Sequence, residues 1–86
     1  MKCSIEISMY PLHQQYVDPI IDFIKKLRTY PNLIVETNGM STQVFGDYDK
    51  VMNAINSEMK HVFLNEHKVV FNLKAINSHL QEKPQF

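Results

Sequence analysis

Three consecutive side chains that form hydrogen bonds, Ser41, Thr42 and Gln43, stand in mid-chain within a strand-like run. Hydroxyl and amide groups cannot all enter a core without partners, because each unpaired buried group costs free energy. The run therefore indicates either a strand with one hydrated face or a binding site. A few hydroxyls and amides beside aromatic rings are the groups that orient a heterocyclic small molecule.

Other chemically reactive residues form no catalytic or metal-binding motif. The four histidines lack the spacing of a metal site, so we expect structural or solvent-exposed roles for them. Cys3 falls on the apolar side of an alternating segment and is expected to be a small core residue. Gly39 and Gly46 are the two glycines, too few for a glycine-rich phosphate loop. We therefore expect no enzyme activity, no metal and no cofactor.

Strands are predicted from period-two alternation of apolar and polar residues. CSIEISMY (residues 3–10) and KVVFNLKAI (68–76) alternate in this way, as strands with one buried face do. LIVET (33–37) and MSTQVF (40–45) are two more strand-like runs, joined by Asn38-Gly39. Asn-Gly between such runs predicts a hairpin with a type I′ turn, in which both central residues have positive φ.

Two helices are predicted from apolar residues at helical spacing. The segment 14–30 places Val17, Ile20, Ile21, Ile24 and Leu27 on one stripe. The second helix follows Asp47, a good N-cap residue, and its stripe consists of Val51, Met52, Ile55, Met59, Val62 and Phe63.

The predicted element order is βαββαβ. It indicates an α+β, ferredoxin-like fold: a four-stranded antiparallel sheet with two helices on one face. We expect residues 1–77 to form a single ligand-binding domain. The polar residues 78–86, which include Pro84, are expected to form a flexible C-terminal tail.

The sheet face opposite the helices should remain open. Alternation assigns to it the side chains of Ser4, Glu6, Ser8, Tyr10, Glu36, Ser41, Gln43, Phe45, Asn72 and Lys74. Met40, Thr42 and Val44 fit the core better, with Thr42 near its margin. Such a mixed polar face is either a solvated surface, a hydrated dimer interface or a small-molecule site.

Composition restricts the class of partner. Lys plus Arg (9) balances Asp plus Glu (9), so no net field attracts nucleic acid or an anionic membrane. No apolar run is long enough to span a membrane, and the N-terminus does not look like a signal peptide. We therefore expect a soluble cytoplasmic protein with no nucleic-acid partner and no membrane insertion.

The segments ISMYPL, GMSTQVFGDYDKVMNAI and KVVFNL, in this order and spacing, resemble the YkoF-like thiamine/hydroxymethylpyrimidine-binding family. The specific parts are the Tyr-Pro pair that ends the first strand and the Ser-Thr-x-x-x-Gly-Asp segment. The resemblance covers residues 4 to about 76. Lys68 stands where a His is common in the family, with His67 one residue earlier, and Ile7 stands where an aromatic residue is frequent.

This resemblance implies that the protein binds thiamine or its hydroxymethylpyrimidine precursor without transforming it, in vitamin B1 salvage, transport or buffering. Since some members carry two such domains in tandem, it also implies a homodimer, with a dimer of dimers left open. The positions that match the family pattern are Ser8, Tyr10, Ser41, Thr42 and Asn72.

Residue chemistry adds three candidates to this ligand-binding set. The amide of Gln43, or that of Asn72, could pair with an aminopyrimidine through a donor and an acceptor together. The carboxylate of Glu6 or Glu36 could offset the thiazolium charge. The alternative function is a ferredoxin-like dimeric regulatory or structural module that binds another small molecule.

Overall fold

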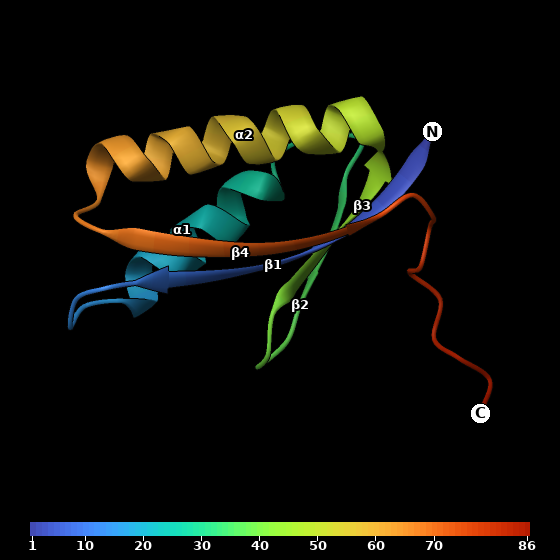
Figure 1. The fold of residues 1–86 in the computed structure, drawn as a ribbon, viewed down its shortest axis with the longest axis horizontal. Helices are drawn as coiled ribbons and strands as arrows, with labels where there is room; N and C mark the ends of the chain where they lie inside the picture. The colour runs from blue at the N-terminus through green and yellow to red at the C-terminus, as the bar shows by residue number, and fades with distance from the viewer.

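The computed structural model describes residues 1–86 and has six regular elements (Figure 1). They are β1 (Lys2–Pro11), α1 (Val17–Leu27), β2 (Ile34–Thr37), β3 (Thr42–Asp47), α2 (Tyr48–Asn65) and β4 (Val69–Ile76). The predicted order βαββαβ is confirmed. Neither helix is sufficiently long and apolar to cross a membrane.

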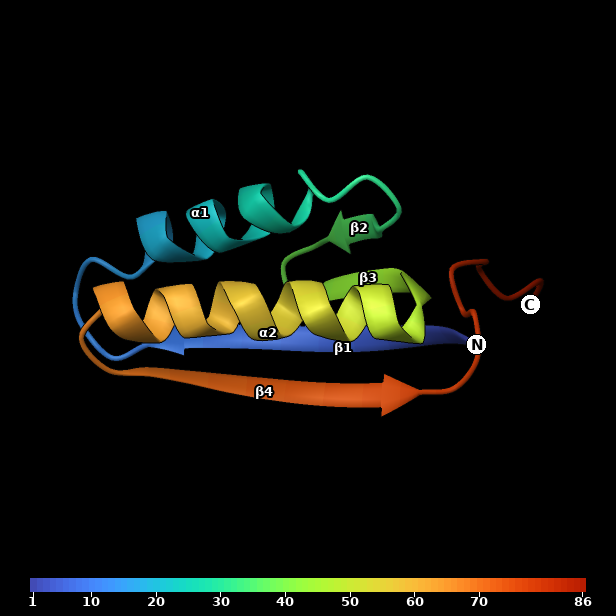
Figure 2. The same ribbon diagram turned by 90° about the horizontal axis from the view of Figure 1, so that it is seen from above.

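The strands form one antiparallel sheet in the order β2-β3-β1-β4. Seen from above, α2 runs along β1, and α1 lies beside it (Figure 2). Both helices pack on the same sheet face, so the predicted ferredoxin-like fold is confirmed. The other face carries no helix and is termed the open face.

The core lies between the helices and the sheet. Side chains at alternate positions of β1 point into it, as period-two patterning requires. Its buried members are Cys3, Ile5, Ile7, Met9, Phe23, Leu27, Val44, Val51, Ala54, Ile55 and Val62. Cys3 is a core residue as predicted, and burial raises the pKa of its thiol.

The buried stripe of α1 is rotated from the predicted one. Phe23 and Leu27, one helical turn apart, are buried, whereas Val17 and Ile21 are exposed. Ile20 is partly buried against the core, so part of the predicted apolar stripe remains outside it. Pro19 lies in the first turn, where its missing N–H leaves no helical hydrogen bond unmade.

The predicted type I′ turn is wrong. No residue other than glycine has positive φ, and neither glycine has it either. The turn is instead centred one residue later, on Gly39 and Met40, with the Asn38 N–H donating to the Ser41 carbonyl at 3.1 Å. The Asn38 side-chain oxygen accepts the N–H groups of Met40 and Ser41 at 2.8 and 3.1 Å. This side-chain oxygen takes the place of a backbone carbonyl as acceptor, so the turn residues need no positive φ. Met40, expected in the core, is 88% exposed as a result.

Part of the C-terminal tail contacts the open face. The Ser4 hydroxyl donates to the Ser78 carbonyl at 2.7 Å and accepts the Leu80 N–H at 2.9 Å. The ring of His79 lies 5.6 Å from that of Phe45, which is buried although it projects from the open face. The flexibility expected for residues 78–86 stays a prediction.

Candidate functional site

A cavity of about 510 Å³ lies where β1 runs past the end of β3, beside α1. We term it the strand-end cavity. Three elements enclose it: the C-terminal part of β1, helix α1 with the segment before it, and the β2–β3 hairpin. Its lining consists of Ile7, Ser8, Met9, Tyr10, Pro11, Leu12, Tyr16, Ile20, Phe23, Ile24, Thr37, Asn38, Gly39, Met40, Ser41 and Thr42. The volume is in the range of small-molecule sites.

The lining of this cavity is uncharged. Aromatic and aliphatic side chains from α1 and β1 form most of the wall, and hydroxyl or amide groups come from Ser8 and the hairpin. No Asp, Glu, Lys, Arg or His is among the lining residues. An apolar wall with a few polar groups is suited to a flat heterocyclic ring, which is buried by the wall and oriented by the polar groups.

A second hollow, of about 420 Å³, lies on the open face under the C-terminal tail. We term it the open-face hollow. Its lining consists of Ser4, Ile5, Glu6, Gln43, Phe45, Lys74, Ala75, Ile76 and Leu80. Unlike the strand-end cavity, it contains a carboxylate and an ammonium group.

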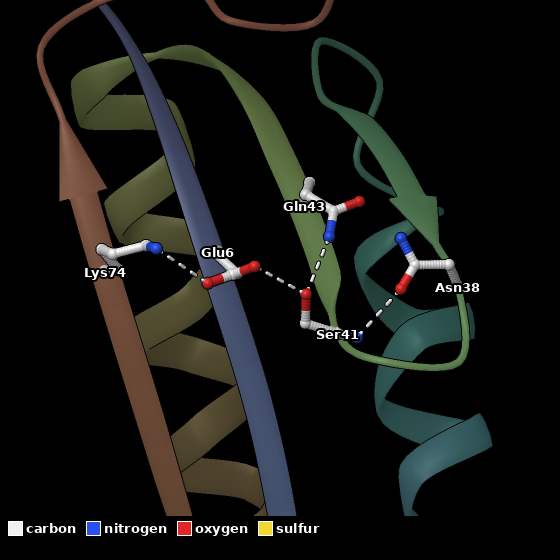
Figure 3. Close-up of polar contacts among 5 residues, drawn as sticks. All are labelled: Glu6, Asn38, Ser41, Gln43 and Lys74. Carbon is white, nitrogen blue, oxygen red and sulfur yellow. Dashed lines mark hydrogen bonds and ion pairs between the residues drawn. The ribbon is translucent and has the colours of Figure 1, made fainter.

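A polar network on the open face contacts both hollows (Figure 3). The Ser41 hydroxyl donates to Glu6 Oε2 at 2.9 Å and accepts from Gln43 Nε2 at 2.8 Å. Lys74 Nζ lies 3.3 Å from Glu6 Oε1. The hydrogen bond from Ser41, followed by the contact with Lys74, holds the pKa of Glu6 below its usual value.

The structure divides the eight predicted ligand-binding residues among these places. The strand-end cavity is lined by Ser8, Tyr10, Ser41 and Thr42. The open-face hollow is lined by Glu6 and Gln43. Glu36 and Asn72 line neither: Glu36 accepts a hydrogen bond from Gln81 at 3.1 Å, and Asn72 pairs with Ser8 across β1 and β4.

Thr42 is the most enclosed of the predicted residues. Its side chain is buried on the helix face, as pairing with Ile7 requires, and its hydroxyl lies 2.9 Å from the Thr37 hydroxyl. The prediction that Thr42 belongs to the core side is therefore confirmed. Through this contact it also fixes the hairpin wall of the cavity.

Sequence reasoning missed the contribution of α1. Tyr16, Ile20, Phe23 and Ile24 line the strand-end cavity from the helix side. Periodicity assigned Ile20 and Ile24 to the core stripe, which does not distinguish packing against a sheet from lining a hollow. The sequence feature that could have indicated this wall is the aromatic pair Tyr16 and Phe23. Seven residues are about two helical turns, so the two rings lie on one side of the helix.

The structure offers no cluster of three or more His, Cys, Asp or Glu side chains that could hold a metal ion. His13 Nε2 lies 3.5 Å from Glu66 Oε2, between the segments that follow β1 and α2. That contact joins two loops rather than forming a site.

Residues 2–81 match the sequence model of the YKOF-related family. The chain belongs to the YKOF-related family. A search among curated proteins finds no match for it.

Solved structures share the fold of this YKOF-related protein. The hypothetical protein MJ1052 of Methanocaldococcus jannascii is 28% identical, with a TM-score of 0.78 over 98% of this chain and 88% of that one. TM0486 of Thermotoga maritima, described as a candidate thiamine biosynthesis/salvage protein, is 16% identical, with a TM-score of 0.80 over 91% and 85%. SP2199 of Streptococcus pneumoniae is 20% identical, with a TM-score of 0.72 over 93% and 90%.

Proposed function

We propose that this YKOF-related protein binds thiamine or its hydroxymethylpyrimidine precursor in the strand-end cavity. It releases the ligand unchanged and serves salvage, transport or buffering of the vitamin in the cytoplasm. The observation that carries the proposal is the cavity itself: about 510 Å³, with an uncharged lining that includes four residues of the first two family-like segments, Ser8, Tyr10, Ser41 and Thr42. The description of TM0486 as a candidate thiamine biosynthesis/salvage protein supports the same ligand class.

The chemistry of the lining fits this ligand class. Tyr10, Tyr16 and Phe23 offer rings that can stack on a pyrimidine or on the cationic thiazolium. Ser8 and Asn38 offer a hydroxyl and an amide to its polar edge. Micromolar affinity requires about 8 kcal/mol, which ring burial and two or three satisfied hydrogen bonds can supply.

The experiment is isothermal titration calorimetry of the protein with thiamine and, separately, with hydroxymethylpyrimidine. Two variants locate the site. Ser8→Leu places a larger side chain in the strand-end cavity. Leu80→Ala alters the open-face hollow, and Leu80 neither lines the strand-end cavity nor bonds to Ser41. We expect saturable binding near one ligand per chain, weakened at least about tenfold by Ser8→Leu and unchanged by Leu80→Ala.

Two results would contradict the proposal. Absence of heat with both ligands into the millimolar range would reject the function. Loss of binding in Leu80→Ala with retention in Ser8→Leu would move the site to the open-face hollow. Matching circular dichroism spectra of both variants must first establish that they fold.

The open face supports the alternative of a dimeric regulatory or structural module. Tyr10, Ile34, Val70 and Ile76 project from this face and are between 41 and 51% exposed. Burying them against a second copy would remove apolar surface from water. We propose a homodimer for this reason, to be tested by sedimentation equilibrium. A dimer that forms without binding either pyrimidine ligand would favour the alternative.

A further inference from the structure

The backbone N–H and C=O groups of successive β1 residues form hydrogen bonds alternately with β3 and with β4. The Tyr48 N–H donates to the Met1 carbonyl, its opposite residue in the β1–β3 register, and the Leu12 N–H donates to the Lys68 carbonyl, its opposite residue in the β1–β4 register. In antiparallel sheets, hydrogen-bonded pairs recur at every second residue. Odd-numbered residues of β1 therefore direct their N–H and C=O groups toward β3, and even-numbered residues toward β4.

The pairing with β3 ends before β1 does. The last pair is Ile7 with Thr42, whereas β1 continues beside β4 as far as Pro11. In Figure 1 the hairpin that joins β2 and β3 diverges from β1, which continues beside α1. Met9 is thus the first residue of β1 that directs its backbone toward β3 without finding a strand there.

The residue that would pair with Met9 by continuation of the register is Met40. Met40 lies in the hairpin turn, and its N–H donates to the Asn38 side chain instead. No backbone hydrogen bond involves Met9 on this side, and Met9 lines the strand-end cavity. The cavity therefore receives one N–H donor and one C=O acceptor from the same extended residue. The next odd residue, Pro11, has no N–H.

We propose that the main-chain N–H and C=O of Met9 bind the edge of a planar ring that presents a ring-nitrogen acceptor next to an exocyclic amino donor. The aminopyrimidine edge common to thiamine and hydroxymethylpyrimidine has this arrangement, so the inference rests on the proposed function and adds its recognition group. The ring nitrogen accepts from the Met9 N–H, and the amino group donates to the Met9 carbonyl. A buried backbone pair left unmatched is costly, which favours ligands that satisfy both groups.

The ligand test removes one partner at a time. Hydroxymethylpyrimidine is compared by calorimetry with its 4-deamino analogue, which keeps the ring nitrogen but lacks the amino donor, and with its 4-dimethylamino analogue. We expect both analogues to bind at least tenfold more weakly, because a site that binds an N–H rejects the ligand lacking it. Equal affinity for all three would overturn the inference and leave the proposed function intact.

The protein test uses amide signals in two-dimensional ¹⁵N–¹H NMR, because a main-chain group cannot be removed by side-chain substitution. On saturation with hydroxymethylpyrimidine, the Met9 amide should shift downfield and its hydrogen exchange should slow at least tenfold. The amides of Ser8 and Tyr10, already paired with β4, are internal controls and should keep their protection. An unchanged Met9 amide in the saturated protein would overturn the inference. Failure of both vitamin-type ligands to bind at all would reject the proposed function first.

Discussion

Ser41 Oγ lies 2.9 Å from Glu6 Oε2, so a hydroxyl at the end of the hairpin is bonded to a carboxylate on the central strand β1. Ser41 lines the strand-end cavity and Glu6 lines the open-face hollow. The two hollows are therefore linked by one hydrogen bond.

Ser41→Ala should raise the pKa of Glu6 toward its usual value. The hydrogen bond from Ser41 stabilises the charged carboxylate and is the first cause of the lowered pKa, ahead of Lys74. The pKa is measured by NMR titration of the Glu6 side-chain carboxyl carbon. Lys74→Met is the comparison and should also raise the pKa of Glu6, because Lys74 contributes both a hydrogen bond and a positive charge. An unchanged Glu6 pKa in Ser41→Ala would contradict the prediction.

The Glu6→Gln variant should lose less unfolding free energy on acidification than the unaltered protein. Because the folded-state pKa of Glu6 is lowered, its contribution to stability is present above the unfolded value of about 4.3 and is lost as pH falls through the folded pKa. The melting temperatures of the two proteins should therefore converge as pH decreases below about 4. Thermal unfolding between pH 3 and 6 measures this, and a constant difference across the range would contradict it.

Gly46→Ala should destabilise the protein by about 1–3 kcal/mol through overpacking. An added Cβ would lie 3.1 Å from Leu33 Cδ2, 3.2 Å from the Asn32 carbonyl oxygen and 3.2 Å from Val51 Cγ2. Urea denaturation gives the change in unfolding free energy.

Gly39→Ala is the matched change at the other glycine and should be neutral or stabilising by about 0.4–1 kcal/mol. Nothing lies within 4 Å of an added Cβ there, and φ is not positive. A clear destabilisation would instead support the type I′ turn expected from Asn38-Gly39.

Leu27→Ala should cost about 2–5 kcal/mol, because Leu27 is fully buried and its removal leaves a cavity beneath α1. Leu64→Ala is the control: Leu64 is 75% exposed on α2, and its loss should change stability by less than about 0.5 kcal/mol. Urea denaturation of both variants measures the loss of unfolding free energy. Equal losses for Leu27→Ala and Leu64→Ala would contradict the burial of Leu27.

Ser4→Ala should release the tail from the open face. The Ser4 hydroxyl is both donor to Ser78 and acceptor from Leu80, so one substitution removes both bonds. Hydrogen exchange at the Leu80 amide should accelerate about tenfold or more. Ser8→Ala, four residues further along β1 on the same face, should leave that amide unchanged. Unaltered Leu80 exchange in Ser4→Ala would mean that other contacts hold the tail.

The order and type of the elements followed from local patterns in the sequence. The alternation of Cys3, Ile5 and Ile7, and the apolar stripes on both helices, reflect burial on one face and need no knowledge of distant residues. The turn was misplaced by one residue because the Asn38 side chain competes with the backbone as an acceptor. That outcome depends on side-chain geometry, which residue type alone does not determine.

The candidate site was predictable only in part. Ser8, Tyr10, Ser41 and Thr42 were identified through family-like segments, and the structure brings them to one cavity. Glu6 and Gln43 were predicted to join them only because alternation puts their side chains on the open face, and the structure places both in the other hollow. The sequence did not indicate that β3 begins only at Thr42 or that α1 lines the space beside it, because both depend on how the strands and the helix diverge in three dimensions.

The alternation of backbone directions along β1 bears on how the proposed recognition would persist through mutation. Met9 places its side chain in the core, and the register of β1 with β3 directs its peptide groups toward the cavity. A substitution at this position thus alters packing but leaves the ligand-reading atoms unchanged. A shift of β1 by one residue would instead exchange the two edges and abolish recognition without altering any amino acid. Specificity of this kind would be encoded in strand alignment, and sequence comparison alone would not detect its loss.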